Sequence, residues 1–456
     1  MSPSKSTLVV IGGGLAGCEA AWQAAEHGID VELYEMRPHR RSPAHRTDTL
    51  AELVCSNSMR GAALENAVGL LKEELARCGS LILSAARANA VPAGGALAVD
   101  RERFSAEVQG RIAAHPRIAL RREEVLDVPL DRPAVVACGP LPGAALASAI
   151  DRLVGTERLH YYDAAAPIVA ADSIDESKMY RKSRYDKGEG DDYLNIPLDR
   201  ETYLRFVEDL RTLPRHDPKD FEQDAQSGKI PYFEGCLPIE EMADRGDDVL
   251  RYGPLKPVGL ADPRNGRIPY AVVQLRKENA SATALNLVGF QTRLSWPAQK
   301  EAFGKLPGLE SAEWLRLGVM HRNTFIDSPR LLDAQLRLRA HPSVWFAGQV
   351  TGAEGYVEAA ACGMIAGRAA AREILNLAAI PVPPETALGA VVAHLQNTAT
   401  ADFQPANVTW AHFPIPSDLP RRGSKRERRR AMAERALVRV AAWEAAHRAT
   451  SLLPAG

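Results

Sequence analysis

Residues 8–21, LVVIGGGLAGCEAA, and residues 31–35, VELYE, decide the fold. The apolar run predicts a buried strand, the glycines a tight turn, the alanine-rich stretch a helix, and the alternating VELYE a second strand. Three glycines fit GxGxxG: the first permits the turn, the second lets a pyrophosphate approach the backbone, and the third lets the helix pack on the strand. An ordinary α/β unit opening with a glycine-rich turn is the plainer interpretation, but the acid that ends the second strand favours dinucleotide binding, since it would hold a ribose hydroxyl. The predicted cofactor-binding residues in this unit are Gly12, Gly13, Gly14, Leu15, Ala16, Gly17 and Glu35.

A second segment, residues 344–371 (VWFAGQVTGAEGYVEAAACGMIAGRAAA), indicates which dinucleotide is bound. A short apolar strand ends near Gly348, which is a predicted cofactor-binding residue. A glycine-punctuated loop follows, and a long helix of small residues starts near Gly355. Flavoproteins of the glutathione-reductase type close their FAD site with such a strand, loop and helix, whereas the plainer interpretation is a further βα unit of a parallel sheet. We therefore expect an α/β fold: a discontinuous, Rossmann-like FAD-binding domain of the glutathione-reductase type with an inserted mixed α/β domain.

The domain organisation follows from this discontinuity. Residues 1–145 are expected to form the first part of the FAD-binding domain, leaving it through the strand and Gly/Pro turn of residues 134–143, AVVACGPLPG. Residues 146–317 are richer in aromatic and charged segments and are expected to be the inserted substrate domain. Residues 318–456 should complete the FAD-binding domain and add a basic helical region.

Composition narrows the class of protein. The 456 residues suffice for two or three domains, and a formal net charge of −1 excludes a surface that is basic throughout. No leader-like or membrane-spanning apolar stretch is present, so a cytoplasmic, soluble protein is expected. Six cysteines without a CxxC pair suggest neither a disulfide framework nor a metal site. The missing CxxC pair, together with the lack of a second GxGxxG, argues against a disulfide reductase.

Two cysteines stand out because they lie in loops. Cys55 belongs to LAELVCSNSMRG (residues 50–61), and Cys236 follows a glycine and precedes Leu-Pro in YFEGCLPIEEM (residues 232–242). Cys18 and Cys362 instead lie in alanine-rich helices and are expected to be inert core. For any single cysteine a small buried hydrophobe is the plainer interpretation, but two loop cysteines in a flavoprotein favour reactive thiols.

A basic run near the C-terminus is a candidate surface for nucleic acid. Residues 421–430 read RRGSKRERRR, which is far less mixed in sign than an ordinary solvated helix face. The predicted phosphate contacts are Arg426, Arg428, Arg429 and Arg430. A second group of cations with aromatic residues lies in residues 180–187, YRKSRYDK, of the insertion.

The blocks quoted above, together with LRYGPLKPVGL, PYAVVQLRKEN, GFQTRL and MHRNTF, closely resemble the bacterial folate- and FAD-dependent tRNA (uracil-5-)-methyltransferases over nearly the whole chain. The resemblance implies transfer of a one-carbon unit from 5,10-methylenetetrahydrofolate to C5 of a T-loop uridine in tRNA. FADH2 then reduces the unit to a methyl group, and NADH or NADPH is the source of the electrons. No membrane contact and no obligate protein partner are expected.

The resemblance also implies roles for individual residues. Cys236 is favoured as the thiol that attacks C6 of uracil, and Cys55 as the thiol that guards or relays the flavin-bound methylene, although the two roles could be exchanged. Tyr356 is a candidate for proton handling or flavin contact. His321 could stack on the pterin or bond to it, and a structural histidine is the alternative.

Three other functions remain open from the sequence. A related FAD- and tRNA-dependent enzyme installs aminomethyl groups on wobble uridines with a GTPase partner, and it shares both coenzyme motifs. A non-catalytic, flavin-containing RNA-binding protein would use the cysteines structurally. A flavin-dependent small-molecule oxidase would leave the basic run unexplained.

Overall fold

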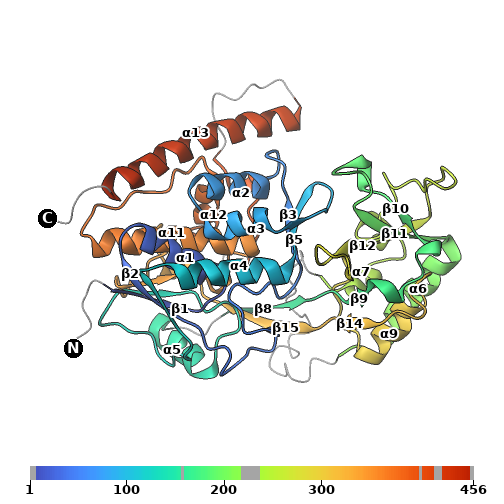
Figure 1. Cartoon of the computed structure of the whole chain (residues 1–456), viewed down its shortest axis with the longest axis horizontal. Helices are drawn as coiled ribbons and strands as arrows, with labels where there is room; N and C mark the ends of the chain where they lie inside the picture. The colour runs from blue at the N-terminus through green and yellow to red at the C-terminus, as the bar shows by residue number, and fades with distance from the viewer. Residues whose placement is uncertain (1–6, 156–158, 217–236, 400–402, 415–423, 452–456) are drawn as a thin grey trace.

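A computed structural model describes residues 7–155, 159–216, 237–399, 403–414 and 424–451 (Figure 1). Its first sheet has five parallel strands in the order β16-β7-β1-β2-β6. The strands are β16 (Val344–Phe346), β7 (Ala134–Val136), β1 (Thr7–Ile11), β2 (Asp30–Tyr34) and β6 (Ile118–Arg121). The strand from the far end of the chain therefore pairs with β7, which in turn pairs with β1. This arrangement confirms the predicted α/β fold.

Two helices of small residues pack closely beside this sheet. A Cβ atom placed on Gly363 of α11 (Tyr356–Ile374) would lie 2.2 Å from the carbonyl oxygen of Ala16 in α1 (Leu15–Glu26). A Cβ atom on Gly367 would lie 2.4 Å from the carbonyl oxygen of Ala20. The alanine and glycine content of both segments is thus required by the approach of their backbones.

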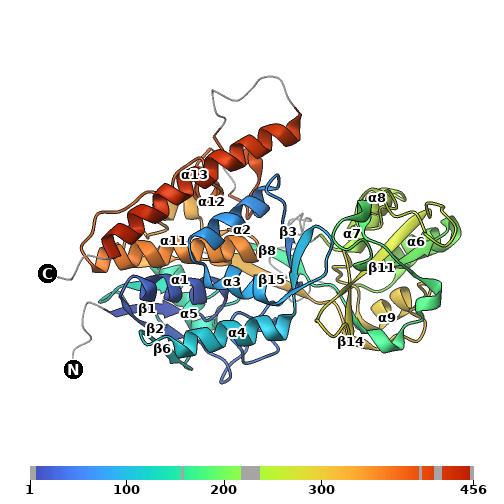
Figure 2. The ribbon, with the colours of Figure 1, turned by 45° about the horizontal axis from the view of Figure 1, so that its top comes forward.

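The remaining helices of this unit cover the sheet and the first two helices. They are α2 (Ala67–Arg77), α3 (Leu81–Ala88), α4 (Arg101–Ala114), α5 (Ala144–Val154), α10 (Ser328–Leu331), α12 (Ala387–Leu395) and α13 (Lys425–Ser451). The long α13 lies over α2, α11 and α12 in both views (Figures 1 and 2). Its C-terminal half is fixed by the buried ion pair of Glu444 with Arg368 of α11, at 2.7 Å.

The second sheet belongs to the middle of the chain and has its own hydrophobic core. Its order is β10 (Tyr180–Arg181), β11 (Tyr193–Leu198), β12 (Ala271–Lys277), β13 (Ala284–Leu287), β9 (Ile168–Ala170) and β14 (Trp314–Arg316), and the strands are antiparallel. Its helices are α6 (Arg200–Thr212), α7 (Ile239–Asp244), α8 (Val249–Tyr252) and α9 (Trp296–Gly304).

Two small sheets lie between these units. The antiparallel ribbon of β8 (Leu159–Ala164) and β15 (Met320–Phe325) leads into the middle of the chain and back out. The other sheet joins β3 (Ser58–Gly61), β5 (Ala96–Val99) and β4 (Ala90–Val91). Among the described residues, no helix combines the length and the apolar character that a bilayer crossing requires.

Candidate functional site

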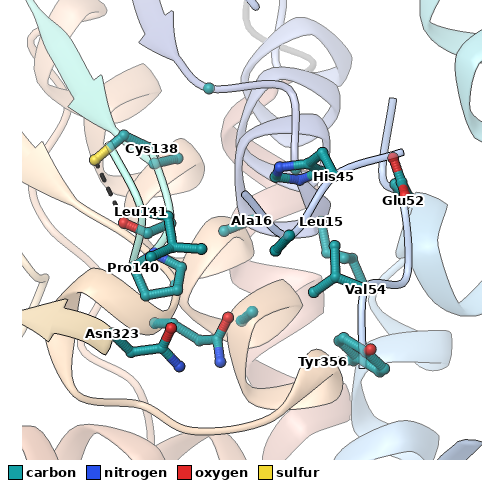
Figure 3. A pocket seen from close by; sticks show the side chains of 18 of the residues that line it. Leu15, Ala16, His45, Glu52, Val54, Cys138, Pro140, Leu141, Asn323 and Tyr356 are labelled. Carbon is teal, nitrogen blue, oxygen red and sulfur yellow. Dashed lines mark hydrogen bonds between the residues drawn. The ribbon is translucent and has the colours of Figure 1, made fainter. Parts of the chain in front are cut away.

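A cavity of about 340 Å³ opens where the strands of the parallel sheet end. Its walls are the segments that follow β1, β2, β7 and β16, the starts of α1 and α11, the loop before β3, and the β8–β15 ribbon. Figure 3 shows Leu15 and Ala16 between Val54 on one side and Leu141 on the other, with Tyr356 and Asn323 nearby. The predicted site residues that line the cavity are Gly12, Gly14, Leu15, Ala16, Glu35, Cys55, His321, Gly348 and Tyr356.

The first turn after β1 fits a pyrophosphate. Gly14 precedes α1, its side chain is a hydrogen atom, and a Cβ atom there would meet no atom of the described residues within 4 Å. No side chain in the described part of the chain caps α1, and its first turn carries no acid. The helix N-terminus is therefore available to an anion. Gly12 has a φ of +107°, and a Cβ atom on it would lie 2.5 Å from the carbonyl oxygen of Ala137.

Gly13 and Gly17 support this turn without lining the cavity. The N–H of Gly13 donates to Glu35 Oε2 at 2.9 Å. A Cβ atom on Gly17 would lie 1.8 Å from the carbonyl oxygen of Gly12, so the first turn of α1 can pack on the end of β1 only if this residue is glycine.

Glu35 follows β2 and is buried in an ion pair with Arg37. Arg37 Nε donates to Oε1 at 2.9 Å and one of its terminal nitrogens donates to Oε2 at 3.1 Å. Burial raises the pKa of Glu35, but the hydrogen bonds and charge of Arg37 outweigh burial and hold this pKa below its ordinary value. The carboxylate is thus ionised at the cavity wall, where a ribose hydroxyl could donate to it.

The start of α11 forms another wall. Gly348 (φ +83°) and Gly355 (φ +105°) adopt conformations that favour glycine, and Gly355 directly precedes α11. The next residue, Tyr356, places its hydroxyl against the loop before β3, where it accepts the N–H groups of Cys55 at 2.9 Å and Ser56 at 3.1 Å. Burial and the neighbouring Cys55 raise the pKa of this phenol, so it stays protonated.

Cys55 is half-buried, and its Sγ lies 4.0 Å from the carbonyl oxygen of Ala164 on β8. The contact with Tyr356 therefore joins two predicted site residues from distant segments of the chain. Cys18 and Cys362 are fully buried, as expected for core residues. None of the five cysteines described by the structure is in a disulfide.

His321 lies on β15, opposite Asp163 of β8. Burial, followed by the charges of Arg316 and Arg46, lowers the pKa of His321 to about 4. Its Nε2 is buried and makes no hydrogen bond with a described residue. The ring is thus neutral at physiological pH and has a nitrogen available to a ligand.

Two polar residues of the cavity wall, Gln349 and Glu354, were not predicted, nor was Tyr161, which contacts Glu354 without lining the cavity. Tyr161 of β8 donates to Glu354, whose second oxygen accepts Gln349 Nε2 at 2.8 Å. Burial, then the charge of Asp163, raises the pKa of Glu354 to about 8, so this acid is mostly protonated near neutral pH. Glu354 stands two residues before Tyr356 in a glycine-punctuated loop, a signal that could have identified it. Tyr161 carried no such signal.

Arg60 lines the cavity and is half-buried, and Lys72 is buried beside it. Arg60 has a φ of +64° and contacts both carboxylate oxygens of Glu358 in the first turn of α11. Lys72 donates to the carbonyl oxygens of Arg60 at 3.2 Å and Gly61 at 2.6 Å. Burial, then the charge of Arg60, lowers the pKa of Lys72 to about 7. These contacts fix β3 against α2 and α11.

The other predicted residues lie elsewhere. Cys236 falls outside the described residues. The four arginines of the basic run are in the first turns of α13 and do not line the cavity. Arg426 pairs with Glu65 at 3.0 Å and Arg430 with Glu434 at 3.2 Å, whereas Arg428 and Arg429 have no carboxylate partner among the described residues.

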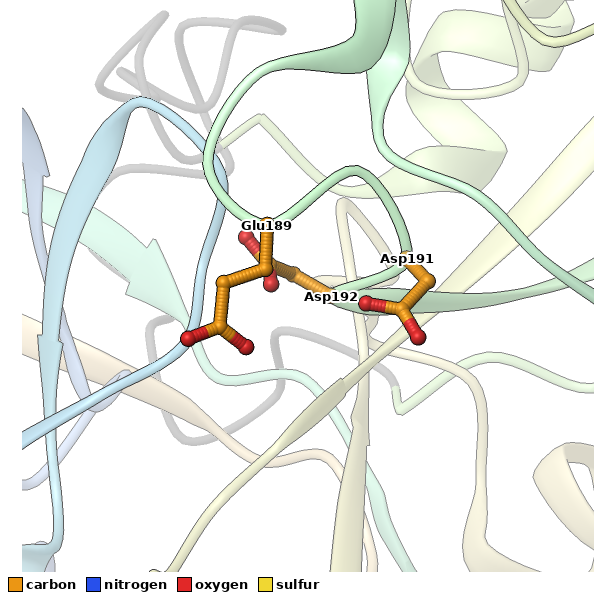
Figure 4. A group of neighbouring side chains, drawn as sticks. All are labelled: Glu189, Asp191 and Asp192. Atoms are coloured by element: carbon orange, nitrogen blue, oxygen red, sulfur yellow. The ribbon is translucent and has the colours of Figure 1, made fainter.

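Glu189, Asp191 and Asp192 form a separate acidic group on the insertion, with carboxylate oxygens within 4.8 Å of one another (Figure 4). Asp192 Oδ2 accepts the N–H of Gly94 at 2.5 Å. This carboxylate therefore joins the insertion to the β4–β5 turn.

Comparisons with known proteins agree with this geometry. The family "Glucose inhibited division protein A" matches residues 7–378. The methylenetetrahydrofolate--tRNA-(uracil-5-)-methyltransferase TrmFO of Pelobacter propionicus is 55% identical over 96% of this chain and 95% of its own length. The protein of the same name from Symbiobacterium thermophilum is 55% identical over 98% of this chain and 99% of its own length.

A solved structure supports the fold. GidA of Aquifex aeolicus superposes with a TM-score of 0.68 at 16% identity, over 98% of this chain and 74% of that one. The chain belongs to the glucose inhibited division protein A family and, by its near-full-length relatives, to the methylenetetrahydrofolate--tRNA-(uracil-5-)-methyltransferases.

Proposed function

We propose that this protein transfers a one-carbon unit from 5,10-methylenetetrahydrofolate to C5 of a T-loop uridine in tRNA and reduces it to a methyl group, giving 5-methyluridine. The observation that carries the proposal is the meeting of Cys55, Tyr356 and His321 in the cavity that also contains the dinucleotide-binding turn. A thiol, a protonated phenol and a neutral imidazole beside a flavin site are suited to base activation and proton transfer.

FAD is held, in this proposal, by the GxGxxG turn, with Glu35 at the ribose and the loop after Gly348 closing the site. When bound and reduced by NADH or NADPH, FAD carries the one-carbon unit and supplies the reducing electrons. The residues of this chain orient the FAD. The N-terminus of α1 attracts its diphosphate, and the start of α11 lies across the cavity from that turn.

The thiols supply the nucleophilic step. Uracil C5 attacks an electrophilic carbon only after a thiolate has added to C6, which turns the ring into an enolate. We assign this addition to Cys236 and a guarding or relay role to Cys55, with exchange of the two roles as the alternative. Tyr356 positions Cys55 through two backbone N–H groups.

His321 and the arginines of α13 are assigned to the substrates. A neutral His321, whose Nε2 makes no hydrogen bond with a described residue, can stack on the pterin or accept a hydrogen bond from it. The basic run is proposed to bind the tRNA backbone.

The reaction is proposed to occur in the cytoplasm. The boundaries between the FAD-binding domain and the inserted domain, at residues 145 and 317, stay predictions.

The alternatives are less well supported. Relatives that are 54–56% identical carry the methyltransferase name, so the wobble-uridine reaction is not favoured. A non-catalytic RNA-binding protein would not need a half-buried thiol and a neutral imidazole in the flavin cavity. A small-molecule oxidase would not need the basic run.

The decisive experiment incubates the purified protein with unmodified tRNA, 5,10-methylenetetrahydrofolate and NADPH, and measures 5-methyluridine by mass spectrometry. The product should appear at the T-loop position and should require folate. Cys236→Ala should abolish it while leaving flavin bound and reducible. Absence of product with flavin-loaded wild-type protein would overturn the proposal.

The thiol assignment has its own test. A stable adduct with tRNA containing 5-fluorouracil should form with the wild-type protein and disappear in Cys236→Ala. If the adduct persists in that variant and disappears in Cys55→Ala, the two roles are reversed.

A further inference from the structure

Asn57, two residues after Cys55, joins the loop before β3 to both large units of the molecule. Its side chain is fully buried. Its Nδ2 donates to the carbonyl oxygens of Val99 in β5 at 3.0 Å and of Lys277 in β12 at 2.9 Å. Its Oδ1 accepts Nε of Arg276 in β12 at 3.0 Å. Both amide hydrogens and the amide oxygen are therefore used, on a strand from the first part of the chain and on a strand of the second sheet.

Arg276 contacts two consecutive residues of this loop at once. Besides the bond from its Nε to Asn57, one of its terminal nitrogens donates to Ser56 Oγ at 2.8 Å. These two nitrogens lie in one plane at a fixed spacing, so the contacts set how Ser56 and Asn57 are oriented relative to β12. Because the side chain of Arg276 is buried, water does not compete for them.

Ser56 continues this connection to the flavin site. Its N–H donates to the hydroxyl of Tyr356 at 3.1 Å, and the N–H of Cys55 donates to the same hydroxyl at 2.9 Å. Tyr356 is the first residue of α11 and lines the cavity together with Cys55 and Ser56. A continuous series of hydrogen bonds therefore runs from β12, through Arg276 and Ser56, to the phenol that holds the backbone of Cys55.

The part of the loop before Ser56 has separate supports. Arg316 of β14 donates to the carbonyl oxygen of Val54 at 2.5 Å. Arg101 of α4 donates to the carbonyl oxygen of Cys55 at 3.4 Å. Neither contact involves Arg276, so removing the guanidinium of Arg276 should loosen the loop after Cys55 and leave the rest of it in place.

We propose that Arg276, acting through Ser56 and Asn57, is a positioning residue that sets the direction of the Cys55 thiol at the flavin site. A residue of the second sheet thereby takes part in the active site without lining the cavity. Displacing a reacting group by about 1 Å can cost on the order of a hundredfold in rate, so the position of this loop matters for the chemical step. The proposal rests on the proposed function for the reaction whose rate it affects.

The first test is kinetic and uses flavin-loaded Arg276→Met, which keeps an apolar stem and removes the guanidinium. The kcat for 5-methyluridine formation should fall by about tenfold or more, with the KM values for tRNA and folate changed less than about twofold. Arg276→Lys should recover at most part of the rate, because an ammonium cannot reproduce the planar two-point contact. A raised KM with a normal kcat, or full recovery with lysine, would overturn the proposal.

The second test needs no methylation activity. Hydrogen exchange of the flavin-bound protein, without tRNA or folate, is followed by mass spectrometry of peptides that cover residues 54–58. These amides should exchange faster in Arg276→Met than in the wild type, while those of residues 7–26 should be unchanged. Unchanged exchange at residues 54–58 overturns the proposal, and this result stands apart from any failure of the proposed function.

Arg211→Met is the matched control. Arg211 of α6 also donates from Nε and a terminal nitrogen, at 3.0 and 2.6 Å, but to the carbonyl oxygen of Ala243 within the unit of the second sheet. This variant should keep the wild-type kcat and the wild-type exchange of residues 54–58. Flavin absorbance of each variant reports folding. Equal losses of kcat in Arg211→Met and Arg276→Met would indicate general destabilisation and would overturn the positioning role.

Discussion

Gly14 and Gly17 belong to one motif but have different physical roles. At Gly17 a Cβ atom would lie 1.8 Å from a backbone oxygen, whereas at Gly14 it would enter the cavity. The backbone of Gly14, with φ −76°, suits any residue. We expect Gly14→Val to fold but to lose FAD, because the side chain occupies the place of the pyrophosphate. Flavin absorbance and circular dichroism of the purified variant check this.

Gly17→Val serves as the contrasting variant. It should lose both flavin and cooperative unfolding, because the start of α1 can no longer pack on the end of β1. Full flavin absorbance in Gly14→Val would show that the diphosphate does not lie at this turn.

Single residues of the site were predictable where they stood in a local motif. The turn glycines and Glu35 were selected because each lies at the end of a strand or the start of a helix that the sequence pattern defines, whereas Tyr356 was selected through the family resemblance. Tyr161 was not, since its contact with Glu354 joins residues more than a hundred positions apart in the sequence. No periodicity encodes such contacts.

At the scale of elements, α12 depends on a side chain from α2. Glu74 accepts the N–H groups of Ala387 at 2.8 Å and Leu388 at 2.9 Å, and Thr386 Oγ1 accepts that of Gly389 at 2.8 Å. Glu74→Ala would leave two buried N–H groups unsatisfied. The free energy of unfolding in urea should fall by about 2–4 kcal/mol.

The neighbouring Glu73 provides the control. It pairs with Arg77 at 2.9 Å and Arg87 at 2.8 Å on the protein surface. Glu73→Ala should cost at most about 1 kcal/mol, because exposed ion pairs contribute little. Equal losses in the two variants would contradict the capping role of Glu74.

The strands and helices that were predicted correctly are those that a local sequence pattern marks. The strand, turn and helix at residues 7–26 and the strand and helix at residues 344–374 appear as expected. The β8–β15 ribbon was not predicted, because its two strands lie far apart in the sequence, and the β3–β5–β4 sheet was not, because its strands are short.

At the scale of the whole molecule, α13 combines an anchored half with an exposed basic start. Arg428 and Arg429 have no carboxylate partner among the described residues, while Trp443 and Glu444 are fixed against α11. Changing Arg426, Arg428, Arg429 and Arg430 to Gln should weaken tRNA binding. The slope of log affinity against log salt should decrease by up to about 0.9 for each lost phosphate contact. Filter binding over a range of salt concentrations measures this.

Arg439→Gln is the control, because Arg439 lies farther along α13 and its side chain is 3.7 Å from Glu385. It should bind tRNA like the wild type, and flavin reduction by NADPH should be normal in both variants. If the fourfold variant keeps the parental salt slope, the RNA surface must be sought at Arg181, Lys182, Arg184 and Lys187.

The position of β16 beside β7 also determines how the protein can fold during translation. The ribosome releases β1, β2 and β7 long before β16 and α11, since residues 137–343 intervene. Until residue 374 has emerged, the open edge of β7 and the α1 surface around Ala16 and Ala20 are exposed on the nascent chain. Unpaired strand edges and uncovered apolar helices favour aggregation. A polypeptide that ends within the insertion is therefore a substrate for chaperones and proteases, and not a half-sized flavoprotein.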